Sequence, residues 1–263
     1  MRWDLPAEVI ARALRTRVVV RHEQFTLPKS LGSATTLRVG FASDFHAGPT
    51  TPTRIIERAC EALAEARPDL VLLGGDFVSL RGRDATRVLE PLRQIRPPLG
   101  KFAVLGNHDL WSEPDEVLAV LERADVQLLD NASMRLPAPF QRTLIVGLDD
   151  HFAGVPDASK PTWDESCATL LLIHQPSGVL DAPGRPFDVA MAGHTHAGQI
   201  VFGPIVLVVP EGALSRTYLY GRYELELHQH LLVSSGVGNS TVPLRIGASP
   251  EVVICTISGR ASV

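Results

Sequence analysis

Cysteine is scarce in this chain of 263 residues, which removes two ways of stabilising a fold. The three that occur, Cys60, Cys167 and Cys255, lie far apart and show no CxxC spacing. The pattern therefore predicts neither a disulfide framework nor a thiolate zinc site. A reducing compartment fits it best.

Long hydrophobic runs are missing as well. The longest apolar stretch, Ile200 to Val209, is broken by Gly203-Pro204 and is too short to span a bilayer. The N-terminus lacks the apolar region of a secretory signal. On these grounds we expect a cytoplasmic protein.

A large excess of charge of one sign is also absent. The formal net charge is -4, the pI is about 6.1, and lysine occurs only at Lys29, Lys101 and Lys160. Such a chain has no bulk attraction to nucleic acid or anionic lipid, so nucleic acid is not expected as a partner. An anion would have to bind at a local site, and we expect its positive charge to come from metal.

The chain is long enough, with 45% hydrophobic residues, to bury one large core. We expect a single domain over residues 1–263, with an N-terminal extension at 1–16 and a core from about 17 to 257. The sequence indicates no particular oligomeric state.

The extension carries a short amphipathic pattern, formed by Leu5, Val9, Ile10, Ala13 and Leu14. It predicts a terminal helix that lies with this small apolar face on the domain. The alternative is a helix in weak peripheral contact with a membrane.

Strand and helix patterns alternate through the first half of the chain, which predicts an α/β fold built from βαβ units. The expected elements are strands at Val18–Leu27, Leu37–Ala42, Leu70–Leu73 and Phe102–Leu105, and helices at Thr53–Ala66, Asp84–Ile95 and Pro114–Arg123. The second half shows mainly short strands, at Val126–Leu129, Thr143–Leu148, Thr169–Ile173, Phe187–Met191, Gln199–Val208, Tyr218–Leu227, Leu231–Ser234 and Glu251–Ile257. Two layers of sheet with helices outside account for both halves.

Five short polar motifs each follow an apolar run that reads as a buried strand. They are Asp44-Phe45-His46, Gly74-Gly75-Asp76, Gly106-Asn107-His108-Asp109, the lone His174, and Gly193-His194-Thr195-His196. Since open α/β sheets place their sites at the carboxyl ends of the strands, we expect these side chains to converge on one crevice. Five of the nine histidines fall in these motifs.

The residue types in the motifs are metal ligands. Asp44 and His46 can clamp an ion around Phe45, Asp76 can bridge two ions, and Asn107 offers an amide oxygen. Each motif alone has a plain structural explanation, such as a polar turn or a satisfied core histidine. Their joint occurrence in this order predicts a site for two metal ions.

These motifs resemble those of the calcineurin-like metallophosphoesterase family. The segments Val233–Gly238 and Pro243–Ile246, with Gly198-Gln199, are similar to the bacterial YaeI/YkuE-like branch of that family, over residues 17 to 257 or so. Ala197 stands where the branch usually has glycine, a change that leaves the ligands intact. The branch often carries an N-terminal signal or anchor, which is not visible in this sequence.

The resemblance implies a four-layer αββα sandwich of two mixed β-sheets flanked by helices. It also implies two divalent ions, with manganese expected and iron, zinc or nickel as alternatives. Asp44, His46, Asp76 and His196 would hold the first ion, and Asp76, Asn107, His174 and His194 the second. Hydrolysis would proceed by attack of a metal-bridging hydroxide, with His108 as leaving-group acid or transition-state donor and Asp109 orienting its ring.

The expected substrate is a small phosphoester or a lipid-linked phosphate, cleaved at a phosphodiester or pyrophosphate-type bond. A phosphomonoesterase with the same centre is the alternative, and a noncatalytic scaffold of this fold is the rival from another class. Substrate contacts are expected from Trp111, Asp150 and His151, with Phe152 and Leu148 adding an apolar wall. The alternatives are a solvated loop at 149–152 and a Trp111 that only packs on the following helix.

Overall fold

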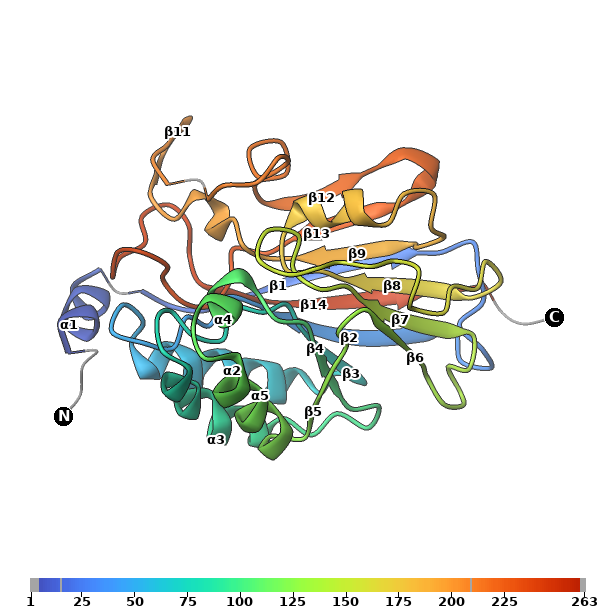
Figure 1. Ribbon diagram of the computed structural model, residues 1–263, viewed down its shortest axis with the longest axis horizontal. Coiled ribbons are helices and arrows are strands. Elements are labelled where there is room, and N and C mark those ends of the chain that lie inside the picture. Colours follow the sequence, from blue (N-terminus) through green and yellow to red (C-terminus); the bar gives the residue numbers. More distant parts are fainter. Residues whose placement is uncertain (1–4, 15, 209, 261–263) are drawn as a thin grey trace.

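Two six-stranded mixed sheets face each other in the computed structural model, which describes residues 5–14, 16–208 and 210–260 (Figure 1). The first sheet consists, in spatial order, of β1 (Val19–Thr26), β14 (Glu251–Ser258), β2 (Thr36–Ala42), β3 (Leu70–Leu73), β4 (Lys101–Ala103) and β5 (Val126–Leu128). The second consists of β12 (Gly221–Glu224), β13 (His230–Val233), β9 (Val189–Ala192), β8 (Ala168–Leu172), β7 (Thr143–Gly147) and β6 (Ala132–Arg135). In each sheet four consecutive strands run parallel, from β2 to β5 and from β13 to β7.

Helices cover the outer face of the first sheet, on the lower side of Figure 1. They are α2 (Thr53–Ala66), α3 (Thr86–Gln94), α5 (Pro114–Arg123) and the 3₁₀ turn η1 (Gly82–Ala85). The helix α2 has the expected bounds because Ile55, Ile56, Ala59, Cys60 and Leu63 recur at helical spacing and are all buried. Burying each large side chain of such a face stabilises the fold by roughly 1.5–3 kcal/mol.

A second hydrophobic core fills the space between the two sheets. Along β3 the side chains alternate, so that Leu70 and Leu72 point into this inter-sheet core while Val71 and Leu73 pack with the helices. Leu172 of β8 and Met191 of β9 meet them from the second sheet. A parallel strand buried on both faces explains the unbroken apolar runs of the sequence.

The outer face of the second sheet is covered more thinly. The 3₁₀ helix η2 (Pro176–Asp181) and ring side chains such as Trp163, Tyr218 and Tyr223 shield a third core there. The predicted fold class, two mixed sheets flanked by helices, is confirmed, with one of its outer layers made mainly of 3₁₀ helix and loops.

Three local expectations differ from the structure. The expected strand Gln199–Val208 is a separate hairpin of β10 (Val201–Phe202) and β11 (Ile205–Val206), because Gly203-Pro204 turns the chain, with a φ of 59° at Gly203. Two elements were not predicted: β6 and the one-turn helix α4 (Asn107–Trp111). Short 3₁₀ helices also form at η3 (His196–Gly198) and η4 (Glu226–His228).

The N-terminal helix α1 (Leu5–Ala13) exists, but only part of the apolar face expected to pack on the domain does so: Ile10 is half-buried against Pro52 and Ile55, while other residues of that face point outward. Leu5 and Val9 are 60% and 62% exposed, whereas Ala7 and Ala11 are buried. The small alanines let the helix approach the body closely, and the buried Glu8 accepts a hydrogen bond from Arg54 at 2.8 Å. The rest of the predicted extension, residues 1–4 and 15, lies outside the described residues.

Within the described ranges, none of the helices is long and apolar enough to cross a membrane.

Candidate metal centre

The predicted ligands come together at the carboxyl ends of parallel strands from both sheets. Asp44 follows β2 and Asp76 follows β3 in the first sheet, while His174 follows β8 and His194 follows β9 in the second. Asn107 begins α4, four residues after Ala103, the last residue of β4. The crevice therefore lies where the two sheets meet.

Five of these residues have a left-handed backbone. The φ angles are 54° at Asp44, 42° at His46, 53° at Asp76, 70° at His194 and 52° at His196. Side chains other than glycine rarely adopt this region, which costs on the order of 1 kcal/mol or more per residue. Such a concentration at strand ends turns each chain sharply and aims the side chains into one site.

The first ligand group consists of Asp44, His46 and His196, all buried. The Nε2 atoms of His46 and His196 are 3.0 Å apart, and His196 Nε2 lies 3.6 Å from Asp44 Oδ1. His46 Nε2 is 3.4 Å from Asp76 Oδ2, which connects this group to the next.

The second ligand group consists of Asn107, His174 and His194. His174 Nε2 lies 3.2 Å from Asn107 Oδ1 and 3.3 Å from His194 Nδ1. It is also 3.4 Å from the same Asp76 oxygen, Oδ2. Asp76 thus lies between the two groups, as the bridging position requires.

Hydrogen bonds on the far sides of two rings show that this donor set fits a cation. His174 Nδ1 lies 2.7 Å from the carbonyl of Gly74, and His194 Nε2 lies 2.8 Å from that of Glu211. A carbonyl accepts, so these two nitrogens carry protons, and His174 Nε2 and His194 Nδ1 are directed at each other; in neutral rings these two nitrogens bear lone pairs. A metal ion held between these two nitrogens would be attracted by both lone pairs. Imidazole, carboxylate and amide donors suit manganese, iron or zinc.

Burial and neighbouring charges shift the pKa values of the site residues in opposite directions. Burial alone would lower the pKa of His174, but the Asp76 carboxylate raises it well above its ordinary value. Burial would raise the pKa of Asp76, yet His174 and the neighbouring imidazoles lower it. Burial raises the pKa of Asp44 to about 6 and lowers that of His46 to about 3.

Two hydrogen bonds through these ligands tie the sheets together. The backbone N–H of His194, which follows β9, donates to Oδ1 of Asp44, which follows β2, at 3.0 Å. His174, after β8, donates to the carbonyl of Gly74 next to β3. Ligands from one sheet are thus oriented by groups of the other.

His108 lies beside the ligands, but its orientation differs from the prediction. Its Nδ1 lies 2.7 Å from the carbonyl of Ser79, and its ring meets His46 edge-on with centroids 4.8 Å apart. Asp109, expected to orient this ring, instead accepts from the backbone N–H groups of Val78 and Gly106. As the third residue of α4, Asp109 folds back onto the helix start, so the orienting role is wrong.

A pocket of about 310 Å³ opens over the ligands. Trp111 and Phe152 form one wall, with ring centroids 5.6 Å apart and nearly perpendicular planes. Val208, Pro210, Glu211, Ser240 and Thr241 also line it. No sequence pattern indicated these last five residues, because they reach the site from loops that follow the hairpin and β13.

The expected substrate contacts at Asp150 and His151 are not found. Asp150 is buried, where Oδ1 accepts from the N–H groups of Phe152 and Ala153 and Oδ2 accepts from Gln175. His151 Nδ1 lies 2.7 Å from Asp181 of η2. Both residues shape the loop and only Phe152 reaches the pocket, while Leu148 is buried in the third core.

Arg245 is a buried residue of the site that sequence reasoning missed. Its Nη2 lies 2.9 Å from His196 Nδ1, and its guanidinium also donates to the carbonyl of Gly238. Burial lowers its pKa to about 10. The only sequence signal was its place in the Pro243–Ile246 segment that resembles the bacterial branch.

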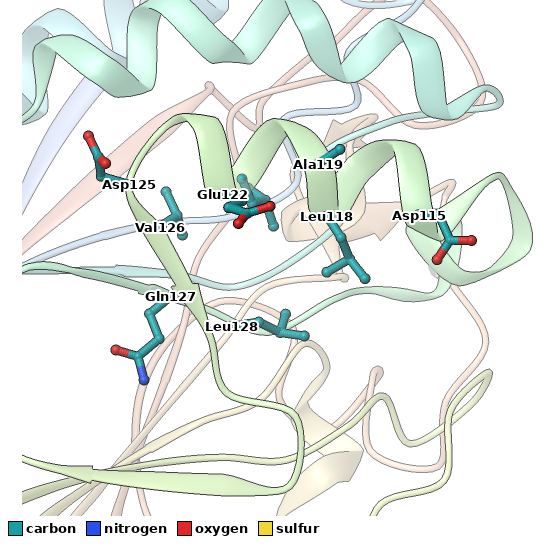
Figure 2. Close-up of a pocket in the computed structure, with 9 residues that line it drawn as sticks. Asp115, Leu118, Ala119, Glu122, Asp125, Val126, Gln127 and Leu128 are labelled. Carbon is teal, nitrogen blue, oxygen red and sulfur yellow. The ribbon is translucent and has the colours of Figure 1, made fainter.

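A larger hollow, of about 590 Å³, lies elsewhere, between α5 and β5 (Figure 2). Figure 2 shows the carboxylates of Asp115, Glu122 and Asp125 around it, with Leu118 and Leu128 between. In the described part of the chain, the groups that could hold a metal all lie around the first pocket and not here. An acidic rim also repels an anionic substrate, so the smaller pocket is the functional candidate.

Comparison with known proteins agrees with this geometry. An uncharacterized metallophosphoesterase of Helicobacter pylori is 31% identical over 82% of this chain, which spans 58% of that protein's length. The phosphodiesterase YaeI of Escherichia coli is 29% identical over 84% of this chain and 82% of its own length. A dimetal phosphatase from Danio rerio shares the fold, with a TM-score of 0.51 and 13% identity over 80% of this chain and 90% of that one.

The profile of the calcineurin-like phosphoesterase family matches residues 37–198, a span that contains the two ligand groups. That span is more than half of the sequence, and it includes the strands β2, β3, β8 and β9 that position the ligands. The chain therefore belongs to the calcineurin-like phosphoesterase family.

Proposed function

We propose that this protein is a dinuclear metal-dependent phosphohydrolase that cleaves a phosphodiester or a pyrophosphate-type bond. The observation that carries the proposal is the pair of ligand groups joined at Asp76, with ring nitrogens of His174 and His194 directed at each other 3.3 Å apart in the second group. A noncatalytic scaffold has no need to retain every ligand in this arrangement.

The two groups would hold two divalent ions, of which we propose manganese as the native metal. Asp44, His46, Asp76 and His196 would surround the first ion, and Asp76, Asn107, His174 and His194 the second. When bound, the ions would polarise the phosphoryl oxygens and activate water for in-line attack. Two divalent ions bring four positive charges and the two carboxylates remove two, so the centre would attract an anionic phosphoester.

The position of His108 in the pocket supports a role for it in protonating the leaving group. Its Nδ1–H is held by the Ser79 carbonyl, and the residue lines the pocket next to Asp76. With Nδ1 fixed, the proton that a leaving oxygen needs would come from Nε2 of the doubly protonated ring. We propose this general-acid role for His108, with Ser79 as its orienting partner.

The pocket lining favours a diester over a monoester. Trp111 and Phe152 on one side and Val208 and Pro210 elsewhere in the lining offer apolar surface for a second substituent. Among the described lining residues there is no lysine or arginine, whereas a monoester dianion calls for additional positive charge. The name of YaeI, a phosphodiesterase, supports the same reading.

Kinetics with matched aryl esters test the proposal. We expect manganese-stimulated, chelator-sensitive hydrolysis of bis-nitrophenyl phosphate, and little activity on duplex DNA, since the chain carries no excess of basic residues. Metal analysis of the same preparation should find two ions per chain. A monoester preference of about tenfold or more in kcat/KM, or about 1.4 kcal/mol, would favour the phosphomonoesterase instead.

A further inference from the structure

The hairpin β10–β11 is apolar on both of its faces. No charged side chain occurs from Ile200 to Val208. On one face, Val201 and Val206 pack against Gly198 of the site loop. On the other, Phe202, Ile205 and Leu207 are 52%, 58% and 60% exposed, and we call these three residues the hairpin patch.

The hairpin patch serves no visible packing purpose. A two-stranded ribbon with one buried face normally alternates apolar and polar residues, because the outer face meets water. Here the outer positions hold large apolar side chains on an element that projects from the body at the upper left of Figure 1. Contiguous exposed apolar residues of this kind mark an interaction surface.

The hairpin patch continues into the wall of the candidate site. Val208, next to Leu207, lines the metal pocket together with Pro210. At the base of the hairpin, the N–H of Val201 donates to the carbonyl of Ile246 at 2.8 Å. Whatever covers the hairpin patch therefore also lies at the mouth of the pocket.

The helix α1 adds a second apolar surface near that base. Leu14 and Arg17, just after the helix, line one hollow with Ile246 and Gly247. Leu5, Val9 and Arg12 share the outward helix face, at i, i+4 and i+7, and Arg12 has 72% of its side chain exposed. Bulky apolar groups flanked by arginines form the pattern of a surface that rests on anionic lipid.

The size and the charge of the exposed surface decide which kind of partner covers the hairpin patch. Three half-exposed side chains fall well short of the ~800 Å² per partner that a stable protein interface buries, which disfavours a second copy of the chain. They suffice for reversible insertion into the lipid headgroup region, since each buried methylene contributes about 0.8 kcal/mol. Arg17, together with Arg12, which shares the single carboxylate of Glu8 with Arg54, complements an anionic surface.

We propose that the hairpin patch docks this protein on an anionic lipid bilayer and holds the mouth of the metal pocket at the bilayer surface. The substrate class that follows, which rests on the proposed function, is a phosphoester with a lipid as one substituent. Such a substituent would reach Trp111 and Phe152 from the bilayer along Val208 and Pro210 of the pocket lining.

Vesicle co-sedimentation of the full chain tests the docking itself. Wild type is compared with a triple variant, Phe202→Ser with Ile205→Ser and Leu207→Ser, on vesicles of phosphatidylcholine with phosphatidylglycerol. The wild type should bind, and the triple variant should bind at least about tenfold more weakly. Turnover of bis-nitrophenyl phosphate in solution should be equal for both, because the hairpin patch lies outside the pocket lining.

Two control variants distinguish the loss of the hairpin patch from a loss of the fold. Phe202→Leu with Ile205→Val keeps the hairpin patch apolar and should bind like wild type, as should Leu180→Ser, which changes an exposed leucine of η2. Wild type that stays in the supernatant, or a triple variant that binds as well as wild type, would overturn the inference. A concentration-dependent dimer lost only in the triple variant, without vesicle binding, would assign the hairpin patch to a second copy instead. Since aryl diester turnover is measured separately, failure of docking and failure of the proposed function give different results.

Discussion

Asp76 is the residue at which the two ligand groups meet, since its Oδ2 lies 3.4 Å from both His46 Nε2 and His174 Nε2. Replacing it by asparagine removes a negative charge that offsets the repulsion between two cations. Asp76→Asn should therefore lose both ions together, with activity falling in parallel. Metal analysis of the purified variant measures this.

The matched control for that variant is Asp188→Asn, a buried aspartate that pairs with Lys29 away from the site. It should keep full metal content. Two tightly held ions with full turnover in Asp76→Asn would show that this carboxylate does not bridge.

His108 should separate chemistry from metal binding. His108→Ala is expected to keep both ions and to lose roughly 10²- to 10⁴-fold in kcat, the usual scale for a positioned acid. The loss should shrink with better leaving groups, because they need less protonation. The measurement is kcat against leaving-group pKa for a series of aryl diesters; a variant that lacks one ion would make His108 a ligand.

For single residues, the sequence predicted which side chains come together at the site, but not all of their roles. The candidate ligands could be recognised together because their motifs follow strands in a characteristic order and spacing. Asp109 and Asp150 were misassigned because their partners, the N–H groups of Val78 and Phe152, depend on how short loops fold back. Arg245 reaches His196 across 49 positions of sequence, which no local pattern encodes.

Among the elements, the turn before His194 controls how closely the two sheets approach. A Cβ at Gly193 would overlap the Asp44 carboxylate and the Ser43 hydroxyl. Gly193→Ala should therefore displace Asp44 and weaken metal binding by about 10- to 100-fold, as disturbed support of a ligand does. Manganese titration of the folded variant, checked by circular dichroism, gives the affinity.

A second glycine provides the comparison. Gly184 has a φ of 66° with open space around its Cβ position, so Gly184→Ala carries only the backbone cost of about 1 kcal/mol. Its manganese affinity should equal that of wild type. Equal affinities in both alanine variants would contradict the contact between Gly193 and Asp44.

The ends of helices and strands were predictable wherever a long periodic pattern of apolar residues ended at a clear stop signal such as proline. The helix Thr53–Ala66 satisfies both conditions, with five buried apolar residues and Pro68 behind it. By contrast, α4 has only five residues, too few for any period to show. The predicted face of α1 was wrong for Leu5 and Val9, because the most buried side chains there are the small Ala7 and Ala11 and the Glu8 that pairs with Arg54.

For the molecule as a whole, metal should act as a stabilising ligand. The ions would bind the folded state alone, so ligand at a hundredfold excess over Kd adds about 2.7 kcal/mol. For a chain of this size that corresponds to roughly 5–10 °C in Tm. Calorimetry with manganese and with a chelator measures the shift, and Asp76→Asn should show little of it; an equal shift in that variant would point to binding elsewhere.

The inter-sheet core has a consequence for the centre that it supports. Because each ligand group takes side chains from both sheets, the thickness of the layer formed by Leu72, Leu172 and Met191 sets the gap across which ions must be held. A methyl group gained or lost in this layer would alter the distance between the ligands of the two sheets. The same change under α2 would alter only the position of that helix. The inter-sheet core should therefore tolerate few changes of side-chain volume, because the metal site depends on its thickness. The core under the helices should tolerate more.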